Sequence, residues 1–193
     1  MMLREPILKE LGIATDASVL DEIRKLADQQ SVEMRKQMSA MNPPHGDKVR
    51  EVEAKLRLQF DPEFKKLLTP EQFTRVRQIY WQRMGIGALQ EAEIVEALQL
   101  TKEQQTQISD LIYDRFQKIR NVNNPAEGRP LGPANEETRR KIEEITTETQ
   151  SRGEQILTAE QRQKFADLKG KPFDLSSLRV NRRPEATQSS KDE

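Results

Sequence analysis

The chain has 193 residues, of which 34% are hydrophobic and 33% are charged, and it contains no cysteine. Its 32 basic and 32 acidic residues give a formal net charge of zero with interleaved signs, which argues against a broad basic surface for nucleic acid or a membrane. The missing thiols exclude disulfides, thiolate nucleophiles and cysteine-based metal sites, and no apolar run is long enough to be inserted across a bilayer.

Apolar residues recur at helical spacing along most of the chain, and no stretch shows the alternation of a half-buried strand. Two Pro/Gly-containing breaks, at 42–47 and 123–135, interrupt this pattern. The helices expected in chain order cover residues 7–11, 16–40, 47–67, 70–83, 91–98, 102–120, 135–156 and 159–169. The sequence therefore predicts an all-α fold made of long helical hairpins.

A five-residue pattern, Leu-Thr-x-Glu-Gln, begins three of these helices. With the threonine at the N-cap, the glutamine falls at the third helical position, from which it can accept the threonine N–H and complete a capping box. The first copy also has Pro70 at the first helical position, which its fixed φ suits. The predicted capping residues are Thr69 and Gln72, Thr101 and Gln104, and Thr158 and Gln161.

The pattern lies inside a longer internal repeat. Ile7 aligns with Ile94 and Leu11 with Leu98, and in each half a long helix, a break, a second long helix and a capping-box helix follow. We expect a first unit at 1–84, a glycine-containing flexible joint at 85–90, a second unit at 91–175 and a polar, disordered tail at 176–193. The two units are expected to pair as a cradle-like pseudo-dimer in a monomeric chain; a homodimer through separate chains is the alternative.

The candidate partner-binding residues come from two places. The stretch Arg75–Arg83 contains Tyr80 and Trp81; Trp81 lies off the apolar stripe of its helix and is expected to be an exposed anchor, whereas Arg75 is expected to point away from the core. The second place is a run of methionines, whose side chains repack easily against different partners: Met34, Met38 and Met41. Core packing is the competing interpretation of both sets.

Helical hairpins that begin at Leu-Thr-x-x-Gln resemble the LTxxQ-motif family, the Spy/CpxP group of periplasmic proteins. The residues that carry the resemblance are Leu68–Gln72, Leu100–Gln104 and Leu157–Gln161. It implies an all-α, ATP-independent chaperone or envelope-stress sensor, exported by a signal peptide that we expect upstream of residue 1. Family members form cradle-shaped dimers, whereas this chain carries the unit twice and is neutral rather than basic.

Residue chemistry offers little for catalysis, so we expect a protein that is not an enzyme and uses no cofactor. His45 is the single histidine and no Gly-x-Ser-x-Gly stretch is present, which argues against a Ser-His-Asp triad, and with no second histidine or cysteine no metal site is expected. The stretch Gly85–Gln90 lacks the third glycine and the preceding strand of a nucleotide loop. The arginines around Tyr80 and Trp81 could stack on nucleic acid, a weaker hypothesis than helix packing.

Two functional hypotheses remain. The first is a periplasmic, chaperone-like or stress-sensing module that binds unfolded or partner proteins. The second is a structural scaffold that self-associates through its long helices.

Overall fold

The computed structural model describes residues 5–13, 18–41, 46–123 and 136–178, and every regular element in these stretches is helical, as predicted. None of these helices is both long enough and apolar enough to cross a membrane. The elements are α1 (Glu5–Glu10), α2 (Ser18–Ser39), α3 (Gly46–Leu67), α4 (Pro70–Met84), the 3₁₀-helix η1 (Gly85–Gln90), α5 (Ala92–Leu98), α6 (Lys102–Asn123), α7 (Glu136–Ile156), α8 (Ala159–Lys169) and the 3₁₀-helix η2 (Leu175–Leu178).

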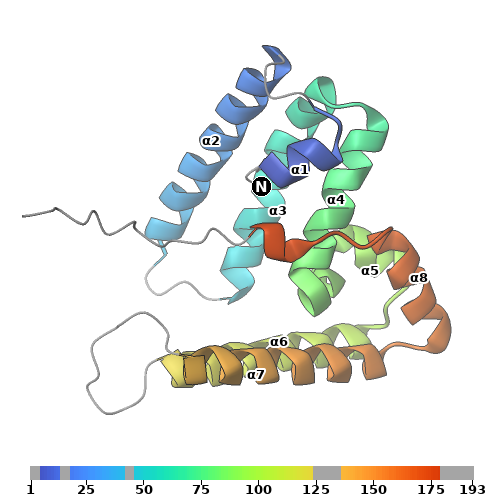
Figure 1. Cartoon of the computed structure of the whole chain (residues 1–193). Helices are drawn as coiled ribbons and strands as arrows, with labels where there is room; N and C mark the ends of the chain where they lie inside the picture. Colours follow the sequence, from blue (N-terminus) through green and yellow to red (C-terminus); the bar gives the residue numbers. More distant parts are fainter. Residues whose placement is uncertain (1–4, 14–17, 42–45, 124–135, 179–193) are drawn as a thin grey trace, which may run out of the picture.

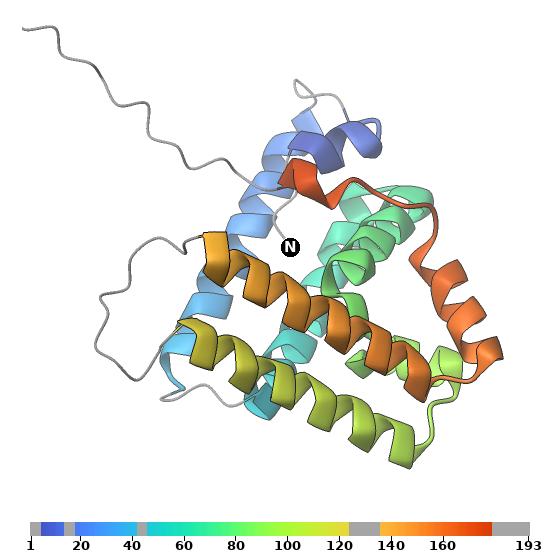
Figure 2. The same ribbon diagram turned by 60° about the horizontal axis from the view of Figure 1, so that its bottom comes forward.

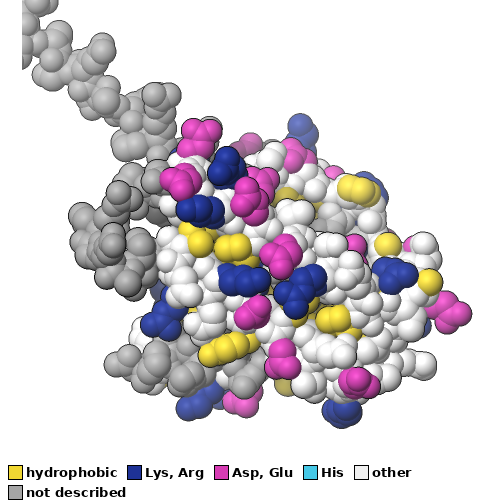
Figure 3. Space-filling model, turned by 90° about the horizontal axis from the view of Figure 1, so that it is seen from below, with side chains coloured by type: hydrophobic (Ala, Val, Ile, Leu, Met, Phe, Trp, Pro, Cys, Tyr) yellow, Lys and Arg dark blue, Asp and Glu magenta, His cyan; other side chains and the backbone are white. Residues whose placement is uncertain are grey.

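The same order of helix lengths occurs twice. Helices α1 to α4 contain 6, 22, 22 and 15 residues, and helices α5 to α8 contain 7, 22, 21 and 11 residues. Helices α2 and α3 form one long hairpin, and α6 and α7 form another that runs crosswise beneath the first (Figures 1 and 2). Figure 3 shows acidic and basic side chains interleaved over the face seen from below, where α6 and α7 lie.

The two short helices end in the same way. Gly12, two residues after α1, and Gln99, the residue after α5, both have positive φ, 65° and 52°. One residue further on, the Ile13 N–H donates to the Leu8 carbonyl at 2.9 Å and the Leu100 N–H to the Val95 carbonyl at 3.0 Å. These are Schellman ends, which satisfy carbonyls that the last helical turn leaves free.

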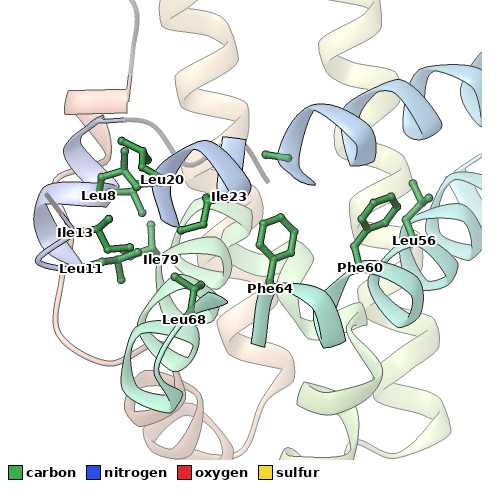
Figure 4. Packing of buried hydrophobic residues seen from close by; sticks show 12 residues of the cluster. Leu8, Leu11, Ile13, Leu20, Ile23, Leu56, Phe60, Phe64, Leu68 and Ile79 are labelled. Atoms are coloured by element: carbon green, nitrogen blue, oxygen red, sulfur yellow. The ribbon is translucent and has the colours of Figure 1, made fainter. Parts of the chain in front are cut away.

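The first hydrophobic core joins α1, α2, α3 and the part of α4 up to Ile79. Figure 4 shows its side chains gathered between these helices, with Phe64 of α3 beside Ile23 of α2. Ile23 is fully buried, so the α2–α3 hairpin is fixed to α1 by the burial of its apolar stripe.

The second core joins the C-terminal part of α4, η1, α5, α6 and α8. Its centre includes Ile86, Ala88 and Leu89 of η1, all buried. Residues 85–90, expected from their glycines to be a flexible joint, thus form a 3₁₀-helix that is packed into the second core. Gly153 of α7 permits this packing, because a Cβ there would overlap the Ile86 side chain.

The chain returns to the first half after α8. Gly170, with φ 64°, ends α8, and the following residues cross α4 and finish as η2 beside α1 and α2 (Figures 1 and 2). Phe173, Leu175 and Leu178 pack against the first core, although the sequence pattern placed the first two in the second unit and Leu178 in the tail. His45 and residues 179–193 of the expected tail lie outside the described residues.

Candidate functional site

All three predicted capping boxes are present. The hydroxyl oxygens of Thr69, Thr101 and Thr158 accept the backbone N–H three residues on, at 3.2, 3.1 and 3.2 Å. In return, the glutamine Oε1 accepts the threonine N–H at 3.0 to 3.1 Å. The preceding leucine is buried in each case, so the motif fixes both the helix start and its attachment to a core.

The glutamine amides also join segments that are far apart in sequence. Gln72 Nε2 donates to the Leu11 carbonyl at 2.9 Å, and Gln161 Nε2 donates to the Leu98 carbonyl at 3.2 Å. Leu11 and Leu98 are the residues that the internal repeat aligns. The glutamine thus ties the last helix of each half to the end of its short helix.

In the second half two boxes meet. Gln104 Nε2 donates to Gln161 Oε1 at 2.8 Å, and Gln161 Nε2 donates back to Gln104 Oε1 at 3.2 Å. Gln104 Nε2 also donates to the Ile156 carbonyl at 3.0 Å. This pair, here called the amide clasp, holds the starts of α6 and α8 together. Position 18, which aligns with Gln104, is a serine, so the first half has no equivalent pair.

Trp81 is not the exposed anchor expected from the sequence, because it is only 4% exposed. Helix α4 contacts both cores: Ile79 belongs to the first, and Trp81 belongs to the second. A residue off one apolar stripe is therefore buried by the other core. The Arg77 guanidinium lies over the Trp81 ring, 5.0 Å from its centroid, which adds a cation–π contact.

Arg75 also differs from expectation. It does not point to solvent, because only 9% of the residue is exposed. Its Nε donates to Glu10 Oε1 at 2.8 Å, and its Nη1 donates to the Lys171 carbonyl at 2.8 Å. The hydrogen bond from Lys171, together with Arg75, holds the pKa of Glu10 below its ordinary value, although burial opposes this. This contact could not be read from spacing, because its three members come from α1, α4 and the segment after α8.

A cleft of about 530 Å³ opens between α2, α3 and α4. The residues from α4 that line it include Phe73, Val76 and Tyr80, all half-buried, and α2 contributes Met34. The cleft therefore brings together two of the five predicted partner-binding residues, Met34 and Tyr80. Met38 and Met41 are half-buried and lie outside the cleft lining, and Trp81 lies in the second core.

Charged side chains of both signs border the cleft. Arg57 pairs with Glu91, and Arg77 Nη2 lies 2.6 Å from Glu93 Oε2, so these two guanidiniums connect the cleft wall to the second half. Asp61 also lines the cleft, and burial raises the pKa of its carboxyl although Arg77 and Arg57 oppose the rise. Burial likewise raises the pKa of Tyr80.

The rim of the cleft adds Asp28 and Arg35 of α2 and Arg83 of α4, all exposed. This arrangement offers an apolar floor with polar edges, which suits an amphipathic ligand. Sequence reasoning missed Phe73, Val76 and Asp61 as site residues. The spacing of residues 73, 76 and 80 places them on one helix face, which indicates a shared apolar surface, but this spacing is equally typical of core packing.

No cluster of three or more histidine or carboxylate side chains that could hold a metal ion occurs in the described part of the chain. The arginines of the Arg75–Arg83 stretch are largely engaged within the protein, since Arg75 and Arg77 make the ion pairs described above. Comparisons with family models, curated proteins and solved structures give no match to this chain.

Proposed function

We propose that the chain is a non-enzymatic helical protein that binds apolar segments of other polypeptides in the α2–α3–α4 cleft. The observation that carries the proposal is the half-buried apolar floor formed by Met34, Phe73, Val76 and Tyr80. The volume of the cleft, about 530 Å³, accommodates a few bulky side chains rather than a folded domain.

The chemistry of the cleft suits a ligand of variable sequence. Met34 can adopt several conformations against different side chains, and Tyr80 offers an apolar ring with a polar end. The rim carries Asp28, Arg35 and Arg83, so polar groups of either sign beside an apolar residue can be accommodated. Apolar surfaces that can repack and are bordered by charges of both signs are typical of binding proteins that accept many partners.

The resemblance to the LTxxQ family supports a chaperone-like or stress-sensing role, with export to the periplasm as part of the same proposal. The threonines and glutamines of the three capping boxes build the scaffold, and of the motif residues Leu68 alone lines the cleft. Their contribution to function is therefore indirect, because they fix the ends of the helices whose faces form the site.

We further propose that residues 1–84 and 91–175 are two copies of one unit that act as a covalent pseudo-dimer. Matched features support this: the Schellman ends at Gly12 and Gln99, and the amide bonds from Gln72 to Leu11 and from Gln161 to Leu98. Solution mass by light scattering at micromolar concentration tests the proposal. A mass of 22.4 kDa supports it, and a stable dimer opposes it.

The functional test is an aggregation assay without ATP. A client protein is unfolded chemically or by heat, and light scattering is followed with increasing amounts of this chain. The proposal predicts suppression at a stoichiometric ratio, and weaker suppression by Tyr80→Ser, which removes an aromatic ring from the floor. Unchanged scattering at several-fold excess of the wild-type chain would refute the binding role.

The scaffold hypothesis keeps one specific observation in its favour. Tyr113 and Phe116 of α6 are 66% and 59% exposed, and they stand three residues apart on one helix face. Concentration-dependent self-association that is lost in Tyr113→Ser with Phe116→Ser would favour the scaffold role.

A further inference from the structure

The segment that follows α8, residues 170–178, is here called the C-terminal strap, and it lies along one flank of α4. That flank presents Arg75, Gln78 and Gln82, which are spaced three and four residues apart and so form one row on the helix. The cleft uses Phe73, Val76 and Tyr80, each two positions earlier, and a shift of two residues turns the helix by about 200°. The strap therefore occupies a surface separate from the cleft.

The strap is held through its backbone. Gln82 Nε2 donates to the carbonyls of Lys169 and Lys171 at 2.7 and 2.8 Å, and Gln82 Oε1 accepts the Phe173 N–H at 2.8 Å. Arg75 Nη1 donates to the Lys171 carbonyl at 2.8 Å. Groups that bind main-chain N–H and C=O do not depend on which side chains the bound segment carries.

The surface that the strap covers, along Arg75, Gln78 and Gln82 of α4, is here called the groove, and the side chains of the strap define what chemistry it accepts. Phe173, Leu175 and Leu178 pack against the first core but stay only partly buried. Lys171 Nζ lies 3.0 Å from Glu10 Oε1, and its side chain is 71% exposed. The accommodated pattern is a basic residue followed at two, four and seven positions by bulky apolar residues.

The fit of the strap is incomplete. Only 9% of Arg75 is exposed, yet its Nη2 has no hydrogen-bond partner among the described residues. At the other end, the strap leaves α8 at Gly170, whose φ of 64° permits a sharp turn that other residues adopt at a cost. An exchangeable segment is expected to have such properties: backbone anchoring, half-buried side chains and an unused donor in its groove.

We propose that the groove along Arg75, Gln78 and Gln82 is a second binding site, for extended apolar polypeptide segments, and that the C-terminal strap is its intramolecular occupant. An external segment with the same basic–apolar pattern displaces the strap. The strap thereby acts as an autoinhibitory ligand, because the groove becomes competent for a partner only in the fraction of molecules in which the strap is detached.

The test uses a fluorescent peptide with the sequence of residues 170–178 and full-length protein. In the strap-weakened variant, Phe173, Leu175 and Leu178 are replaced by serine, which leaves the groove intact. This variant should bind the peptide at least about tenfold more tightly than the wild-type chain, since the competing segment no longer fills the groove. Adding Gln82→Ala to it should reverse the gain.

Two controls separate this site from other surfaces. Val32→Ser changes an exposed apolar residue of α2 and should leave peptide binding at the wild-type level. Met34→Gln alters the cleft on the opposite flank of α4 and should also have no effect, so failure of one proposal leaves the other standing. A peptide whose Phe and Leu residues are replaced by serine should not bind the strap-weakened variant.

A measurement on the wild-type chain guards against misfolding of the variants. Amide hydrogen exchange of residues 170–178 should accelerate when excess peptide is added, because the Phe173 N–H loses its bond to Gln82. Equal peptide affinity of the wild-type and strap-weakened chains, or no binding by either, would overturn the proposal. Exchange that does not change at saturating peptide would also overturn it.

Discussion

The amide clasp should be one of the most sensitive polar contacts in the second half. Replacing Gln104 with alanine removes the bonds from its amide to the Thr101 N–H, the Ile156 carbonyl and the Gln161 amide. A hydrogen bond contributes about 0.5–1.5 kcal/mol net, and the last two of these bonds are partly buried, so the expected loss is about 2–3 kcal/mol. Gln161→Ala removes a matching set and should cost about the same.

The two substitutions share the contact between the amides, so their effects should not add. The double variant should be less destabilised than the sum of the single variants by about 1 kcal/mol, the energy of the shared contact. Gln107→Ala supplies the control, since Gln107 lies on the exposed side of the same helix and should change stability by less than about 0.5 kcal/mol.

The assay is urea unfolding followed by circular dichroism at helical wavelengths, with all four variants at one protein concentration. Losses below about 0.5 kcal/mol for both single variants would show that the glutamine amides exchange freely with water, contrary to this reasoning. Strict additivity in the double variant would show that the two boxes cap their helices independently and that the clasp contributes nothing.

Three further predictions follow from individual residues. Gly153→Ala should destabilise the fold by about 1–3 kcal/mol, since its Cβ would displace Ile86; an unchanged midpoint in urea would contradict this packing. Gln99→Gly should raise stability by about 0.5 kcal/mol because glycine adopts positive φ without strain, and a lower melting temperature would oppose it. The pKa of Glu10 lies below its ordinary 4.5 because of Lys171 and Arg75, so its ionised form stabilises the fold above pH 4.5 and this contribution is lost as the pH falls through the lowered value. Glu10→Gln should therefore be less stable than the wild type at pH 7 and equal to it at low pH, and a constant difference across a pH series of melting curves would contradict the assignment.

The sequence alone was sufficient to predict where three of the helices begin. Thr69, Thr101 and Thr158 cap their helices because the interacting groups lie within three residues of each other, so no tertiary information is needed. The all-α class followed from the same kind of short-range regularity, the spacing of apolar residues along each helix.

Contacts between distant segments could not be predicted in this way. Trp81 is buried because α4 serves two cores, and a single apolar stripe does not reveal a second one. Arg75 is buried because Glu10 and Lys171 meet it from separate parts of the chain. The strap has no helical periodicity, so no sequence pattern predicted that it packs against the first core.

The binding role of the cleft is tested most directly by the affinity for a permanently unfolded client, measured by fluorescence anisotropy. Met34→Gln places a polar amide on the cleft floor at nearly constant side-chain length, and Met38→Gln makes the same change one helical turn away, outside the cleft lining. The account predicts client binding by the wild-type chain, at least about tenfold weaker binding by Met34→Gln, and unchanged binding by Met38→Gln. Equal affinities for all three chains, or no binding by the wild type, would contradict it.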